Sequence, residues 1–155
     1  MVYKQLIINP GSTSTKLALY EDKEKIVQEN VEHDAAQMQQ FDSIADQIPF
    51  RMGIIRDFMA RNSIQEKDLS AVMGRGGLVF GLKTGGYEVN DDLCEALVND
   101  RLSQPHASNL GGLLARELAR PLGIPAYIYD AVTGGELTGG AKITGIRDIE
   151  RRSFC

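Results

Sequence analysis

The chain has 155 residues, of which 43% are hydrophobic and 25% are charged, as in an ordinary globular domain. This composition excludes intrinsic disorder, collagen and coiled coil as the main description. The 17 basic and 21 acidic side chains give a formal net charge of −4, which lacks the basic excess of a protein that holds nucleic acid through its phosphates. We therefore expect a small molecule or another protein as partner.

No apolar run reaches the roughly 18 residues that span a bilayer, and the sequence opens on a strand-like segment rather than a signal peptide. Cys94 and Cys155 are far apart in the sequence and match no metal-ligand spacing. These features predict a reduced, cytoplasmic protein.

Three short strands are expected at the start of the chain, over residues 3–9, 16–20 and 26–32. The first contains the apolar run Leu6-Ile7-Ile8 and ends at the turn signal Asn9-Pro10-Gly11. The second alternates apolar and polar side chains, as a half-buried strand does. Three such strands in succession predict an antiparallel meander.

The hydrophobic period then changes to that of helices. A first stripe consists of Phe41, Ile44, Ala45 and Ile48, and a second consists of Met52, Ile55, Phe58 and Met59. Both follow the i, i+3, i+4, i+7 spacing of an amphipathic helix. Pro49 is expected to interrupt the first helix, and the second is expected to end near Arg61.

The remainder predicts strands alternating with helices. Strands are expected at 69–73, around 87–89 and at 124–129. One helix is expected to be capped by Asn90 or Asp91, and another to be capped by Ser108 or Asn109 and to end near Gly123. The fold class that follows is α/β, with a mixed sheet, an antiparallel N-terminal meander and flanking helices.

Polar clusters follow three of the predicted strands, where α/β sheets bind their ligands. The first is the loop from Asn9 to Lys16, whose four consecutive hydroxyl residues and lysine can hold phosphate oxygens. It is not a P-loop, since the GxxxxGK[ST] spacing is missing and a strand follows it. The same residues also fit a plain polar hairpin turn.

The second cluster is Gly74-Arg75-Gly76-Gly77, where the glycines leave the planar guanidinium free to reach a carboxylate or phosphate. Asp130, at the end of the last strand, can orient a metal-bound water or polarise a partner. A glycine-rich turn with a solvated arginine, and an aspartate opening a turn, are the alternative interpretations.

The third cluster is Pro105-His106-Ala107-Ser108-Asn109 at a predicted helix start, where the imidazole of His106 can donate a hydrogen bond to an anion. A segment that only caps the helix is the alternative. We assign no role to His33.

The motifs, in their order, resemble those of the acetate and butyrate kinases of the actin-like ATPase superfamily. The segment 9–16 resembles the first phosphate loop of that family. Segments 46–51, 74–77, 86–90 and 106–112 resemble the butyrate kinase branch in particular. Acetate kinases carry a histidine before the equivalent arginine, where this chain has Gly74.

The resemblance implies a reversible transfer of the ATP γ-phosphoryl to a short-chain carboxylate, butyrate or a branched-chain acid, which gives an acyl phosphate. ATP and Mg²⁺ are the implied cofactors. The metal ligands that the resemblance implies are Asn9 and Asp130, and the nucleotide-binding residues are Gly11, Ser12, Thr13, Ser14 and Lys16. The substrate-binding residues that it implies are Arg75, His106 and Asn109. The implied catalytic residues are Arg75, His106 and Asp130.

Family members are roughly twice this length and have a second actin-like domain that supplies the adenosine site. The resemblance therefore implies that residues 1–155 form the N-terminal domain, that the second domain is absent, and that this domain alone is at best feebly active. We expect it to self-associate or to bind the missing half. One alternative is a non-catalytic anion-binding or interaction module derived from such a kinase. Another, an actin-like domain of a sugar kinase or phosphatase, should lack the segment 106–112.

Overall fold

The computed structural model describes residues 2–99, 101, 103, 105–135 and 137–151. The strands are β1 (Lys4–Pro10), β2 (Ser14–Glu21), β3 (Glu24–Glu32), β4 (Ala71–Arg75), β5 (Gly86–Glu88) and β6 (Ala126–Tyr129). The α-helices are α1 (Ala35–Met38), α2 (Ile48–Arg61), α3 (Asp91–Val98) and α4 (Asn109–Ala119). Short 3₁₀ turns are η1 (Ala45–Gln47), η2 (Glu66–Asp68), η3 (Arg120–Leu122) and η4 (Gly140–Lys142).

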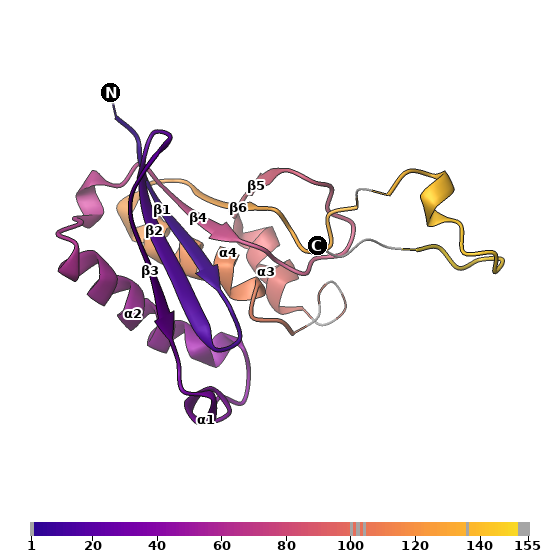
Figure 1. The fold of residues 1–155 in the computed structure, drawn as a ribbon, viewed down its shortest axis with the longest axis horizontal. Coiled ribbons are helices and arrows are strands. Elements are labelled where there is room, and N and C mark those ends of the chain that lie inside the picture. The colour runs from indigo at the N-terminus through magenta and orange to yellow at the C-terminus, as the bar shows by residue number, and fades with distance from the viewer. Residues whose placement is uncertain (1, 100, 102, 104, 136, 152–155) are drawn as a thin grey trace.

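The strands form one mixed sheet in the order β3-β2-β1-β4-β6-β5 (Figure 1). β1, β2 and β3 pair antiparallel as the predicted meander, whereas β4 lies parallel to both β1 and β6. The short edge strand β5 is antiparallel to β6. The predicted α/β class and mixed sheet are confirmed.

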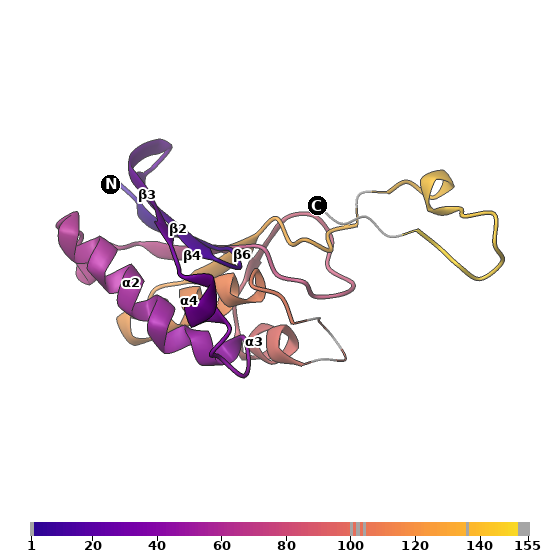
Figure 2. The ribbon, with the colours of Figure 1, turned by 60° about the horizontal axis from the view of Figure 1, so that its bottom comes forward.

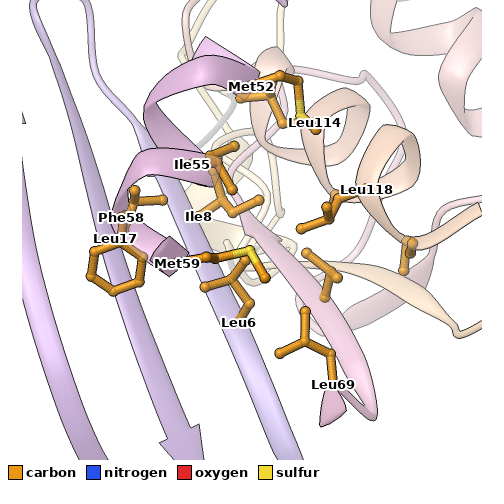
Figure 3. Close-up of a cluster of buried hydrophobic side chains, with 14 of the residues drawn as sticks. Leu6, Ile8, Leu17, Met52, Ile55, Phe58, Met59, Leu69, Leu114 and Leu118 are labelled. Atoms are coloured by element: carbon orange, nitrogen blue, oxygen red, sulfur yellow. The ribbon is translucent and has the colours of Figure 1, made fainter. Parts of the chain in front are cut away.

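The helices α2, α3 and α4 lie on one side of the sheet (Figure 2). Alternate residues of the strands face these helices, because successive side chains of a strand point to opposite faces. The resulting core combines Leu6, Ile8 and Leu17 from the sheet with Met52, Ile55 and Phe58 from α2 and Leu114 and Leu118 from α4 (Figure 3). No helix in the described ranges is both long and apolar enough to cross a bilayer.

The predicted helix over the stripe from Phe41 to Ile48 is wrong. The structure has only η1 there, and Ile48 opens α2 with Pro49 in its first turn. A proline fits that position because the first N–H groups of a helix have no intrahelical acceptor, so the missing donor costs nothing. The second predicted helix, ending at Arg61, is confirmed.

Two predicted helix boundaries are also observed. Asn90 caps α3, its side-chain oxygen accepting a hydrogen bond of 2.9 Å from the Leu93 N–H. Gly123 ends the segment after α4 in the left-handed conformation, with a φ of 66°. Cys94 in α3 is a free thiol, and burial raises its pKa; Cys155 lies outside the described residues.

Glycines bring β4 and α4 into main-chain contact. A Cβ atom placed on Gly74 of β4 would lie 2.0 Å from the carbonyl oxygen of Gly111 in α4, and one placed on Gly111 would lie 2.5 Å from the Arg75 carbonyl oxygen. Only residues without a side chain permit this approach. The contact fixes the first turn of α4 beside the C-terminal end of β4.

Candidate active site

Four of the predicted site residues meet in one pocket at the edge of the sheet. The carboxyl ends of the parallel strands β1, β4 and β6 lie together there and place Asn9, Arg75 and Asp130 side by side. The segment that leads into α4 adds His106. The cavity has a volume of about 180 Å³ and is lined by Asn9, Pro10, Arg75, Gly76, His106, Ser108, Asp130 and Val132.

Arg75 and Asp130 form an ion pair in this pocket. The Nη2 of Arg75 donates to Oδ2 of Asp130 over 3.2 Å, and the two side chains are 57% and 36% exposed. Such an exposed pair adds little to stability. Its effect is to orient the guanidinium, which lines the pocket, through one N–H group, so that the other N–H groups are available for an anion. Asp130 itself has a φ of 59°, a conformation that aspartate tolerates better than most residues.

The His106 ring is held by the residue two positions later. Its Nδ1 accepts a hydrogen bond of 3.1 Å from the Ser108 N–H and lies 2.7 Å from the Ser108 Oγ. We assign the neutral tautomer from this network: Nδ1 is the acceptor, so the hydrogen is on Nε2. The imidazole therefore offers an N–H donor beside the positively polarised N-terminus of α4.

The loop between β1 and β2 presents hydroxyl groups near this pocket. The Gly11 N–H donates to the Ser14 carbonyl over 2.8 Å, which closes the loop, and Ser12 and Thr13 are exposed. Lys16 pairs with Asn9 across the two strands, so both side chains share a face of the sheet. The predicted phosphate-binding residues are thus next to the predicted metal ligand.

Six predicted site residues do not line this pocket: the five nucleotide-binding candidates of the loop, which lie beside it, and Asn109, which is buried away from it. Asn109 is 2% exposed, its Oδ1 accepts from the Leu78 N–H over 2.7 Å, and its Nδ2 donates to the Leu97 carbonyl over 3.0 Å. These bonds fasten the loop after β4 and the C-terminal end of α3 to the start of α4. Ser108, rather than Asn109, occupies the N-cap position. Asn109 therefore supports the site from inside the domain.

Ser108 belongs to the site, although the sequence predicts it only as a possible helix cap. It is buried, it lines the pocket, and it sets the orientation of His106. The available signal was the spacing of a histidine and a serine at a helix start, where side chains bond to nearby backbone rather than to the helix.

His33, for which the sequence predicts no role, lies beneath the loop. The residue is 8% exposed, its ring Nε2 is 2.8 Å from the Thr15 Oγ1, and its backbone N–H donates to the Thr13 carbonyl over 2.8 Å. Burial and the positive charge of Arg51 lower the pKa of His33, more than the nearby Glu32 raises it.

This environment predicts that the chain loses stability on mild acidification. The pKa of His33 is near 6.5 in the unfolded chain and lower in the folded chain. As the pH falls through 6.5, the unfolded state therefore binds a proton more readily than the folded state does, and the folded state loses stability. The free energy of unfolding in urea is expected to be smaller at pH 5.5 than at pH 7.5. His33→Gln should reduce this difference, and an unchanged difference in that variant would contradict the assignment.

Asn9 and Asp130 have the chemistry of a magnesium site. A carboxamide oxygen and a carboxylate are hard ligands, and Mg²⁺ commonly takes one or two carboxylates and completes its shell with water and substrate phosphates. Among the described residues no group of three or more histidine, cysteine, aspartate or glutamate side chains forms a closed metal cage. The donors present fit an ion that is shared with a bound phosphate.

Comparison with known proteins gives the family context. No protein-family model matches the chain. It is 42% identical over 153 residues to butyrate kinase 1 of Clostridium acetobutylicum, a match that covers 99% of this chain and 43% of that protein. The chain is homologous to the N-terminal part of the butyrate kinases. A probable butyrate kinase 2 of Caldanaerobacter subterraneus subsp. tengcongensis is 41% identical over 152 residues, 98% of this chain and 43% of that protein.

The fold agrees with this homology to butyrate kinases. The crystal structure of the acetate kinase of Porphyromonas gingivalis superposes with a TM-score of 0.61 over 98% of this chain and 45% of that one, at 16% identity. A likeness at that identity establishes the fold alone, and it confirms the predicted actin-like ATPase class. The chain thus spans less than half the length of the curated butyrate kinases it matches.

Proposed function

We propose that this chain is the N-terminal domain of a short-chain carboxylate kinase that transfers the γ-phosphoryl of MgATP to butyrate or a branched-chain acid. The observation that carries the proposal is the pocket in which Asn9, Arg75, His106 and Asp130 meet. It lies in a chain homologous to the N-terminal part of butyrate kinases, at the sheet edge where such folds bind ligands. The product is an acyl phosphate.

In this reaction a carboxylate oxygen attacks the γ-phosphorus, the bond to the β–γ bridging oxygen breaks, and ADP leaves. The transition state is loose, so the protein contributes mainly position and charge neutralisation. Arg75 would bind the carboxylate or the equatorial phosphoryl oxygens through its free N–H groups. The Nε2–H of His106 would donate to one of those oxygens as negative charge develops there.

The loop after β1 would bind the nucleotide phosphates. The exposed hydroxyls of Ser12 and Thr13, with Ser14 and Lys16, supply hydrogen-bond donors and one positive charge. Asn9 and Asp130 would hold Mg²⁺, which neutralises charge on the β- and γ-phosphates. Because Asp130 also accepts from Arg75, the metal ligand and the guanidinium are positioned together.

We further propose that the adenosine site lies in a second domain, outside the residues described, as in the two-domain proteins that the sequence resembles. Alone, the chain would then bind its acid and phosphate ligands weakly and turn over slowly. Its most exposed apolar residues in the C-terminal segment are Ile143, Ile146 and Ile149, at 70%, 63% and 55% exposure. These side chains give a second domain, or a second copy, an apolar surface to contact.

The test joins this chain to the C-terminal part of the Clostridium acetobutylicum butyrate kinase 1, a chimera called the joined enzyme below. Hydroxylamine traps an acyl phosphate as a coloured hydroxamate. Product is expected only when butyrate and MgATP are both present, and far less from this chain or the C-terminal part alone. A folded joined enzyme that binds butyrate without any turnover would favour the non-catalytic anion-binding module.

His106→Ala in the joined enzyme is expected to lower kcat by about 10–100-fold, since a neutral donor to the transferring phosphoryl contributes less than a charged one. Ser108→Ala should cost less than about tenfold, because the backbone N–H of residue 108 still bonds Nδ1 and keeps the tautomer. Initial rates of hydroxamate formation at saturating MgATP measure both. Equal losses in the two variants would contradict the assigned role of His106.

A further inference from the structure

A buried arginine lies beneath the loop that we assign to the nucleotide phosphates. Arg51, in the first turns of α2, is 0% exposed. Its Nη2 donates to the Gly11 carbonyl over 2.7 Å, and its Nη1 donates to the Ser14 carbonyl over 2.9 Å. One planar guanidinium thus holds both ends of the loop from below.

The loop shape follows from these bonds. The two carbonyl groups turn inward to the guanidinium, while Ser12 and Thr13, between them, are exposed. The Arg51 Nε donates to Gln47 Oε1 over 3.1 Å, which fixes the plane of the fork on α2 itself. A rigid fork with five donors loses less freedom per hydrogen bond than a lysine would.

A hydrogen-bond chain extends this support to a third point of the loop. The Arg51 Nη1 donates to the Thr15 Oγ1 over 2.8 Å, so the Thr15 hydroxyl hydrogen is directed to the His33 Nε2. Separately, the backbone N–H of His33 donates to the Thr13 carbonyl over 2.8 Å, and the His33 ring packs edge-on against Phe50 at 5.3 Å.

Among the described residues, Arg51 forms no ion pair with a carboxylate. The groups that accept its hydrogen bonds are all uncharged. Burial lowers the pKa of Arg51 to about 10, so it remains a cation at neutral pH. A buried cation without a counterion is costly, and its field is little screened by salt. Anionic phosphates on the exposed side of the loop would supply the missing opposite charge.

We propose that Arg51 is a positioning residue that shapes the phosphate loop from beneath and, through its charge, strengthens the hold of that loop on the nucleotide phosphates. The inference rests on the proposed function, because it takes residues 11–14 as the phosphate-binding loop. It also gives a role to the segment 46–51, which resembles butyrate kinases and to which the proposed function assigns no residue.

The test compares Arg51→Lys and Arg51→Gln in the joined enzyme, with Arg56→Gln as the matched control on the exposed side of the same helix. The KM for MgATP is expected to rise about tenfold in Arg51→Lys, which keeps the charge, and about 100-fold in Arg51→Gln. The KM for butyrate should change less than about threefold in both. Arg56→Gln should match the parent enzyme.

Amide hydrogen exchange on the 155-residue chain separates loop positioning from general destabilisation. In Arg51→Gln and Arg51→Lys the Gly11 and His33 amides, which bond to loop carbonyls, should exchange faster. The Val72 amide, bonded to the Pro125 carbonyl in the sheet, should be unchanged. Unchanged Gly11 and His33 exchange in both variants, or equal rises in the two KM values, would overturn the proposal. An inactive parental joined enzyme would instead refute the proposed function, while the exchange experiment still decides the positioning role.

Discussion

Arg75→Ala in the joined enzyme is expected to lower kcat by about 100–1000-fold without unfolding the protein, the usual cost of removing one charged donor from a phosphoryl-transfer site. Arg75 is the last residue of β4, its side chain is 57% exposed, and it pairs with the partly exposed carboxylate of Asp130 and not with a core residue. The core therefore does not depend on it. Thermal unfolding should be nearly unchanged, while hydroxamate formation nearly stops.

Two further variants make this result specific. Arg61→Ala removes another surface arginine of similar exposure, paired with Glu29 at 2.7 Å, and should leave turnover within about twofold because such pairs contribute little. Arg75→Lys keeps the charge but loses the planar fork, so its kcat should lie between those of Arg75→Ala and the parent. Turnover by Arg75→Ala within tenfold of the parent would contradict the assignment.

Gly74→Ala is expected to destabilise the chain by about 3 kcal/mol or more, a large part of the roughly 5–15 kcal/mol that holds a domain together. The new Cβ would lie 2.0 Å from the carbonyl oxygen and 2.1 Å from the carbonyl carbon of Gly111. Both are main-chain atoms of α4, so no flexible side chain can move aside. The strand and the helix would have to separate.

Gly53→Ala is the matched control for this prediction. Gly53 is an exposed residue of α2, and a Cβ there meets nothing within 4 Å. Alanine should therefore stabilise the helix by about 0.5–1 kcal/mol through its higher helix propensity. Urea denaturation of the three chains, read by circular dichroism, measures both effects. A Gly74→Ala chain within about 1 kcal/mol of the parent would contradict the main-chain contact between β4 and α4.

The sequence predicted most strands because their signal is local. Alternating or continuous apolar runs placed β1, β2 and β4, and the rule that ligands bind beyond strand ends brought Asn9, Arg75 and Asp130 together. The stripe from Phe41 to Ile48 led to a wrong helix prediction because a proline can either end a helix or open one. The residues around Pro49 do not indicate which of the two it does.

Two site details depended on geometry that a sequence pattern does not contain. Each residue of a helix is rotated by about 100° from the next, so a cap at Ser108 instead of Asn109 turns the Asn109 side chain from the pocket into the interior. Arg51 follows the period of the buried face of α2, with Ile55 and Phe58. Its acceptors lie up to 40 positions earlier in the chain, and only the folded arrangement reveals them.

The glycine contact between β4 and α4 also determines how the pocket can fluctuate. Two main chains in direct contact leave no compressible layer of side chains, so α4 cannot slide along the strand without a steric clash. With α4 held against β4, the exposed side chains of Arg75 and His106 adjust to a ligand by rotation, which takes picoseconds to nanoseconds, and not by the slower helix shifts of microseconds to milliseconds. A phosphoryl group arriving between these two residues would meet donors that reorient much faster than any chemical step.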